Sequence, residues 1–198
     1  MTMQQKQNET ASAGTEAAAH WTQSRRATLS LPYYSTWTAD RQPDWQTSKA
    51  KANRSWPATR SLLLGLGFSD PQPASVALDW AGCDVTTSDG RKLSWRNRDR
   101  RYLGYRDVTI RKSRPSGKPT EADKLAAGAV DFLLWTWTNT AGAVCDWLLL
   151  DAGRIVLLLT RPWPVLTMCD AVAVCISWQA LSQAGCIVAA SRGVKLAL

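Results

Sequence analysis

The stretch PTEADKLAAGAVDFLLWTWT, residues 119–138, carries the clearest secondary-structure signal in the chain. Thr120 can cap a helix, and the acidic residues in the turn that follows would complement the positive end of the helix dipole. Apolar residues from Leu125 to Leu133 then recur at helical spacing. We therefore predict a capped helix over residues 121–134.

The sequence beyond this helix predicts short apolar strands. Trp147–Leu150 and Arg154–Leu159 read as two strands around the turn Asp151–Gly153, in which the glycine would adopt the left-handed conformation. Val172–Ser177 and Cys186–Ala190 are rich in β-branched residues and read as two more strands. One helix followed by several strands indicates an α+β fold.

Composition divides the 198 residues into three segments. Residues 1–60 are rich in Gln, Thr, Ser and Ala and carry tryptophans at no regular period, which predicts a disordered, flexible polar arm. Residues 61–118 begin with a stretch that has four acidic and no basic residues and end in residues 91–118, which have eleven basic and two acidic residues. Residues 119–198 form the third segment, an apolar C-terminal module.

Residue usage argues against most enzyme classes. A single histidine, His20, excludes a site with two His ligands, and the five cysteines never occur as C-x-x-C. No nucleophile–base pair is recognisable. We therefore expect a protein that is not an enzyme, holds no metal and no cofactor, and keeps its cysteines as packed thiols.

The apolar C-terminal half does not read as a membrane span. The most hydrophobic window, residues 141–159, contains Asp146, Asp151 and Arg154. A charge near the centre of a span costs about 2.5–3.5 kcal/mol, whereas each Leu, Ile or Val returns only about 0.3–0.6 kcal/mol. The chain begins with polar residues and no secretory signal. We expect a cytoplasmic protein, not a secreted one, with peripheral membrane contact or the nucleus as alternative locations.

The basic segment 91–118 has the composition of a single-stranded nucleic-acid binder. Arginines bind phosphates through two parallel hydrogen bonds, and aromatic rings between them offer faces on which unpaired bases stack. The alternatives are a nuclear-import or docking patch and a plain solvated basic face. The candidate nucleic-acid-binding residues are Arg91, Lys92, Trp95, Arg96, Arg98, Arg100, Arg101, Tyr102, Tyr105, Arg106, Arg111, Lys112, Arg114 and Lys118.

Two functions follow from these segments. Eleven tryptophans against two phenylalanines are unusual for a packed chain, and an overlapping reading frame would explain them. By analogy of composition, the first function is that of a small viral accessory or regulatory protein. It would bind a host protein, a membrane surface or itself through the apolar C-terminal half. The second is RNA or DNA binding by residues 91–118, for which affinity should fall steeply with salt.

Overall fold

The computed structural model describes residues 45–168 and 171–191 and confirms the mixed α+β class. The helices are α2 (Trp45–Gly65), α3 (Val76–Ala81), α4 (Glu121–Ala126), α5 (Ala152–Leu159) and α6 (Trp178–Gln183), with a 3-10 helix, η2 (Arg100–Tyr105). The strands are β1 (Gln72–Pro73), β2 (Val85–Thr86), β3 (Lys92–Asp99), β4 (Asp107–Ser113), β5 (Phe132–Thr138), β6 (Val144–Asp151), β7 (Val165–Thr167), β8 (Val172–Ser177) and β9 (Ile187–Ala190).

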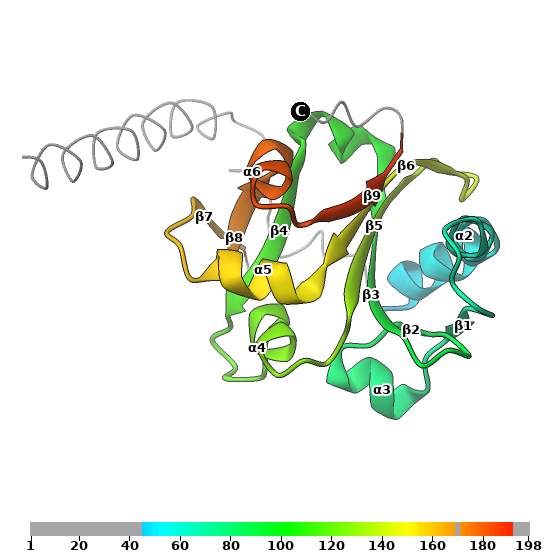
Figure 1. The fold of residues 1–198 in the computed structure, drawn as a ribbon, viewed down its shortest axis with the longest axis horizontal. Helices are drawn as coiled ribbons and strands as arrows, with labels where there is room; N and C mark the ends of the chain where they lie inside the picture. The colour runs from blue at the N-terminus through cyan, green and yellow to red at the C-terminus, as the bar shows by residue number, and fades with distance from the viewer. Residues whose placement is uncertain (1–44, 169–170, 192–198) are drawn as a thin grey trace, which may run out of the picture. The chain divides into compact units, whose positions relative to one another are not determined.

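The strands form two sheets. The six-stranded sheet has the order β1-β2-β3-β5-β6-β9, and the three-stranded sheet has the order β4-β8-β7. Within the larger sheet β3 and β5 are parallel and the other neighbours are antiparallel. Helix α2 lies on one side of the larger sheet, and α4, α5 and α6 lie on the other side (Figure 1).

Helix α2 changes the predicted extent of the polar arm. Residues 45–60, which the composition assigned to that arm, form most of α2, and residues 1–44 lie outside the described part of the chain. Ser55, Thr59 and Leu63 recur at helical spacing and are fully buried. The hydrophobic pattern missed this helix because two of the three residues on its buried face are polar.

The predicted helix 121–134 begins where expected but is much shorter. The Thr120 side chain accepts from the backbone N–H of Asp123, and the Asp123 side chain accepts from the backbone N–H of Thr120, which makes a complete capping box. The helix ends at Ala126, and Gly128 follows with a φ of 68°. Residues 132–138 form β5 instead, which is buried on both faces and therefore shows no strand-like alternation.

The predicted second strand at Arg154–Leu159 is also corrected. Residues 147–150 lie in β6 as expected, but β6 pairs with β5 and β9 and not with the residues that follow it. Those residues form α5, which is capped by Asp151 through the backbone N–H of Arg154 at 2.9 Å. Ile155 and Leu158 are buried three residues apart, which matches the helical period.

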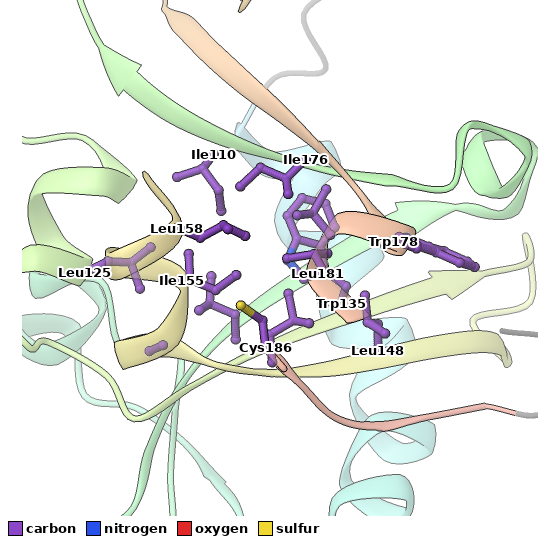
Figure 2. Close-up of a cluster of buried hydrophobic side chains, with 14 of the residues drawn as sticks. Ile110, Leu125, Trp135, Leu148, Ile155, Leu158, Ile176, Trp178, Leu181 and Cys186 are labelled. Carbon is purple, nitrogen blue, oxygen red and sulfur yellow. The ribbon is translucent and has the colours of Figure 1, made fainter. Parts of the chain in front are cut away.

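The two remaining strand predictions are confirmed. The run 172–177 is β8, and residues 187–190 of the run 186–190 are β9. Figure 2 shows Ile176 of β8 and Ile110 of β4 close to Ile155 and Leu158 of α5. This cluster fills the space between the two sheets, and a second cluster that includes Leu63 packs α2 against the opposite face of the larger sheet.

The segments 61–118 and 119–198 are joined by strand pairing in both sheets. Strand β3 of the middle segment pairs with β5, and β4 pairs with β8. The leucines of β6 are buried at positions 148, 149 and 150. The structure therefore covers the apolar run of the C-terminal half with residues of the same chain.

A candidate nucleic-acid interface

The predicted basic segment does not form one continuous surface. It runs through β3, the 3-10 helix η2 and β4, and each of these elements places its basic residues differently. Three of the candidate residues on β3, Trp95, Arg96 and Arg98, are half-buried, whereas Arg100, Arg101 and Arg106 at the turn are exposed.

Trp95 is part of the packing between β3 and α2. Its ring lies 5.8 Å from that of Trp56 on α2, and its indole N–H donates to Thr136 Oγ1 at 2.9 Å. Both contacts face the α2 side of the larger sheet, where Trp95 packs against the cluster around Leu63. These contacts give Trp95 a structural role, and its stacking on nucleic acid stays an untested prediction.

Arg91 and Lys92 lie at the start of β3, at the opposite end of the strand from η2. The Arg91 guanidinium pairs with Asp89 at 2.5 Å and lies 4.2 Å from the centre of the Phe68 ring. Hydrogen bonds from Arg91 and then from Thr87 lower the pKa of Asp89 to about 2. An eight-residue strand spans roughly 25 Å, so these two residues are far from the turn.

Arg96 points to the other side of the sheet and pairs with Glu121 at the start of α4. Asp84 lies nearby, and its carboxylate accepts from Ser94 Oγ at 2.9 Å and from the backbone N–H of Trp95 at 2.6 Å. Burial raises the pKa of Asp84, although the positive charge of Arg96 acts in the opposite direction. Arg96 therefore serves a charge network that ties β3 to α4.

The raised pKa of Asp84 predicts a measurable pH dependence of stability. A carboxyl whose pKa is higher in the folded state takes up its proton on folding, so it favours the folded state at low pH. Between about pH 7 and pH 4, the free energy of unfolding of the wild type should rise relative to that of Asp84→Asn. Urea unfolding at several pH values measures the difference.

Asp89→Asn is the matched control for Asp84→Asn. Because the pKa of Asp89 is lowered, its ionised form favours the folded state, and the advantage of the wild type over Asp89→Asn should shrink as the pH falls. Differences that change in the same direction for both variants would contradict the assignment of the Asp84 pKa.

Arg98 is also held inside the fold. Its guanidinium lies 4.3 Å from the centre of the Trp135 ring, and its Nη2 donates to Thr109 Oγ1 on β4. An arginine that stacks on a buried indole bridges the two sheets and stabilises the core. These contacts give Arg98 a structural role, and its contact with nucleic acid stays an untested prediction.

The turn η2 brings exposed arginines and two tyrosines together. The Asp99 carboxylate caps it by accepting from the backbone N–H of Arg101 at 3.0 Å. The rings of Tyr102 and Tyr105 are stacked, with centroids 6.3 Å apart and planes at 29°. The Arg101 guanidinium lies 4.9 Å from the centre of the Tyr102 ring and donates to the Tyr102 hydroxyl at 3.1 Å.

Two further contacts fix this turn on the scaffold. Arg106 ends it in the left-handed region with a φ of 47°, and its carbonyl accepts from the backbone N–H of Trp178 at 3.0 Å. Tyr102 is half-buried and packs with one side against the core between the sheets. The arginine side chains at 100, 101 and 106 are therefore presented to solvent from a backbone that is held at both ends.

Helix α2 adds Lys51, which the sequence analysis did not select. Burial lowers the pKa of Lys51, and the next contributions come from the charges of Asp99 and Arg101, which places the amine beside the turn. The signal was present in the sequence, because residues 45–60 contain four basic and no acidic residues. Because this part of the chain was predicted to be a flexible arm, its basic residues were not among the predicted binding residues.

A hydrogen-bonded triad holds α2 against the end of β3. The Asn97 side-chain amide donates to Ser55 Oγ of α2 at 2.8 Å, and the Thr138 hydroxyl of β5 donates to Asn97 Oδ1 at 2.8 Å. Asn97 and Thr138 lie near the carboxyl ends of the parallel strands β3 and β5, and η2 follows β3 directly. We call Lys51, Arg100, Arg101, Tyr102, Tyr105 and Arg106 the basic turn.

The remaining candidate residues lie on β4 and the loop that follows it. Lys112 and Lys118 are exposed, and Arg111 and Arg114 are half-buried. Five to twelve residues separate them from Arg106, so the basic turn and this group are two places on the chain. The sequence segment therefore divides into a surface turn, a buried network and a second group of arginines.

Comparisons with known proteins add no functional information. No protein-family model matches the chain, and the search of curated proteins gives no significant match. Within residues 45–168 and 171–191, no three His, Cys, Asp or Glu side chains gather as a metal site would require. No helix in the same ranges is both long enough and apolar enough to cross a membrane.

Proposed function

We propose that the protein binds single-stranded nucleic acid through the basic turn. The observation that supports it best is the stacked pair Tyr102–Tyr105, with the Arg101 guanidinium beside it and exposed arginines at both ends. Cations can bind the phosphates, and tyrosine rings can receive unpaired bases. This combination favours a single strand over a duplex, whose bases are already stacked on one another.

The accessory function through the apolar C-terminal half has less support. That proposal needs apolar side chains at the surface to meet a host protein, a membrane or a second copy. Leu148, Leu149 and Leu150, together with Ile155 and Leu158, are buried within the chain. The exposed large apolar side chains described in this half lie on three different elements: Leu157 on α5, Val165 on β7 and Val188 on β9. The viral, host-interaction and membrane-associated roles therefore remain predictions from composition, and nucleic-acid binding has a surface that fits it.

The tyrosines give the first test of this proposal. We expect the double variant Tyr102→Leu, Tyr105→Leu to bind a fluorescently labelled single-stranded oligonucleotide about tenfold or more weakly, since stacking contributes roughly 1–3 kcal/mol per base. Leucine keeps apolar contact with the core and leaves all charges in place. The salt dependence of binding should therefore be unchanged. Fluorescence anisotropy at several salt concentrations measures both quantities.

Trp80→Leu is the matched control, because Trp80 on α3 is the most exposed large aromatic side chain described, at 80%. It should bind the oligonucleotide as tightly as the wild type. If the tyrosine variant and Trp80→Leu both bind like the wild type, the rings do not receive bases and the proposed mode of binding is wrong. An equal loss in both variants would indicate a general effect of removing aromatic side chains.

A further inference from the structure

The second group of arginines, on β4, is a candidate site that the basic turn does not explain. Burial lowers the pKa of Arg96, and the positive charges of Arg111, Arg98 and Arg114 lower it further, so all three lie near Arg96. The carboxylates that act on or contact Arg96 are Asp84 and Glu121, and the charge of Asp79 acts in turn on Asp84. Four guanidinium groups thus lie near three carboxylates, and a net positive charge remains in a half-buried place.

Two of these arginines are already engaged. Arg96 pairs with Glu121 and is attracted by Asp84, while Arg98 lies on Trp135 and donates to Thr109. Both oxygens of Glu121 are in use, because Oε1 binds Arg96 and Oε2 accepts from the backbone N–H of Arg111 at 3.0 Å. The carboxylate nearest to Arg111 therefore has little capacity left for another guanidinium.

Arg111 and Arg114 have no acidic partner within the described ranges. The Nε of Arg114 is buried and donates to no acceptor there. A buried donor without an acceptor is unfavourable, and native proteins usually satisfy such groups with protein, water or ligand. An anion with several oxygens would satisfy both guanidinium groups, which bind oxyanions through paired hydrogen bonds.

A β-bulge interrupts β4 between these two arginines. Arg111 pairs with Ala173 and Ser113 pairs with Val172, so Lys112 is the extra residue in β4. Arg114 directly follows the end of β4, and both arginines lie near Arg96. Ile110 points to the core between the sheets, as Figure 2 shows.

We propose that Arg111 and Arg114 form a binding site for a phosphate group. The group can be free inorganic phosphate or the terminal phosphate of a nucleic-acid strand, since both present the same oxygens to the guanidinium forks. The site does not depend on the basic turn, because the two places share no side chain. An excess of positive charge at a half-buried place would bind the ligand, whereas the basic turn is an exposed surface.

Calorimetric titration of the full chain with sodium phosphate, at constant ionic strength set by chloride, tests the site. We expect saturable binding that is weakened roughly tenfold or more in Arg111→Ala and in Arg114→Ala, as the loss of a charged hydrogen-bond pair implies. Arg114→Lys keeps the charge but not the fork and should bind with intermediate affinity. Arg161→Ala removes an equal charge elsewhere and should bind like the wild type.

A second arm distinguishes the two sources of phosphate. We compare an oligonucleotide that has a 5′-terminal phosphate with the same strand without it. If the phosphorylated strand binds more tightly and Arg114→Ala removes the difference, the site binds strand ends. Equal affinity for the two strands, together with binding of inorganic phosphate, assigns it to free phosphate.

The proposal is overturned if the wild type binds neither inorganic phosphate nor the 5′-phosphate, or if Arg114→Ala binds phosphate as tightly as the wild type. Circular dichroism spectra and unfolding midpoints show whether each variant is folded. The variant Arg100→Gln, Arg101→Gln, Arg106→Gln should bind phosphate normally, so loss of the basic turn and loss of this site give different results.

Discussion

Replacing Trp137 by alanine should cost about 3–5 kcal/mol of the free energy of unfolding, the range seen when a fully buried large aromatic side chain is removed. The Trp137 side chain is 1% exposed. Its ring lies 5.3 Å from that of Trp178 on α6 and 6.3 Å from that of Trp135. The residue therefore joins the central strand β5 to α6, the helix that precedes β9.

Guanidinium unfolding followed by far-ultraviolet circular dichroism measures this loss, because that signal comes mainly from the backbone and its unfolding midpoint does not require the tryptophan removed. Trp137→Phe is the first control and should cost less, since it keeps a ring and removes an indole N–H that has no acceptor. Trp80→Ala is the second and should stay within about 0.5 kcal/mol of the wild type, as exposed substitutions do. A Trp137→Ala variant as stable as Trp80→Ala would contradict the described core.

Local chemistry predicted those elements whose signals lie within a few residues. The capping box at Thr120 and Asp123 marks the start of α4 at the sequence level, and the structure contains it complete. The β-branched run 172–177 marks β8 in the same way. Neither signal requires knowledge of what packs against the element, which explains why both were predictable.

Elements that depend on distant partners were predicted incorrectly. Strand β5 is buried on both faces because α2 covers one and the three-stranded sheet the other, so its apolar run has no alternation to read. Helix α2 was missed because Ser55 and Thr59 occupy its buried face, and Ser55 is satisfied by Asn97, 42 residues away. Hydrophobic period alone does not contain this information.

The candidate site also has a part that local sequence predicts and a part that depends on distant partners. Arg100, Arg101, Tyr102, Tyr105 and Arg106 are neighbours in sequence, and the structure also places them at one turn. Which strand residues turn inward was not predictable, because it depends on the partners of β3 in the sheet. The contribution of Lys51 was not predictable either, since about fifty residues separate it from the turn.

The second large effect concerns the three exposed arginines of the basic turn. We expect Arg100→Gln, Arg101→Gln, Arg106→Gln to bind a single-stranded oligonucleotide with a salt dependence shallower by about 2 in the slope of log K against log salt, since each phosphate contact contributes about 0.7. Affinity at low salt should fall by about two orders of magnitude or more, because three charge-assisted contacts are lost. Glutamine keeps most of the side-chain length, so the turn should retain its fold.

The control variant Lys92→Gln, Lys118→Gln, Arg161→Gln removes the same net charge from exposed positions outside the basic turn. If binding depended only on the total charge of the chain, the two triple variants would lose affinity equally. If it depends on the turn, the control should keep nearly all of the wild-type slope. Circular dichroism and thermal unfolding verify that both variants are folded.

The most direct measurement is therefore the salt dependence of single-stranded oligonucleotide affinity for the wild type and the two triple variants, by fluorescence anisotropy under identical conditions. The account predicts a steep slope for the wild type, nearly the same slope for the Lys92, Lys118, Arg161 variant, and a slope lower by about 2 for the Arg100, Arg101, Arg106 variant. Equal slopes in the two triple variants, or no salt-dependent binding by the wild type, would contradict it.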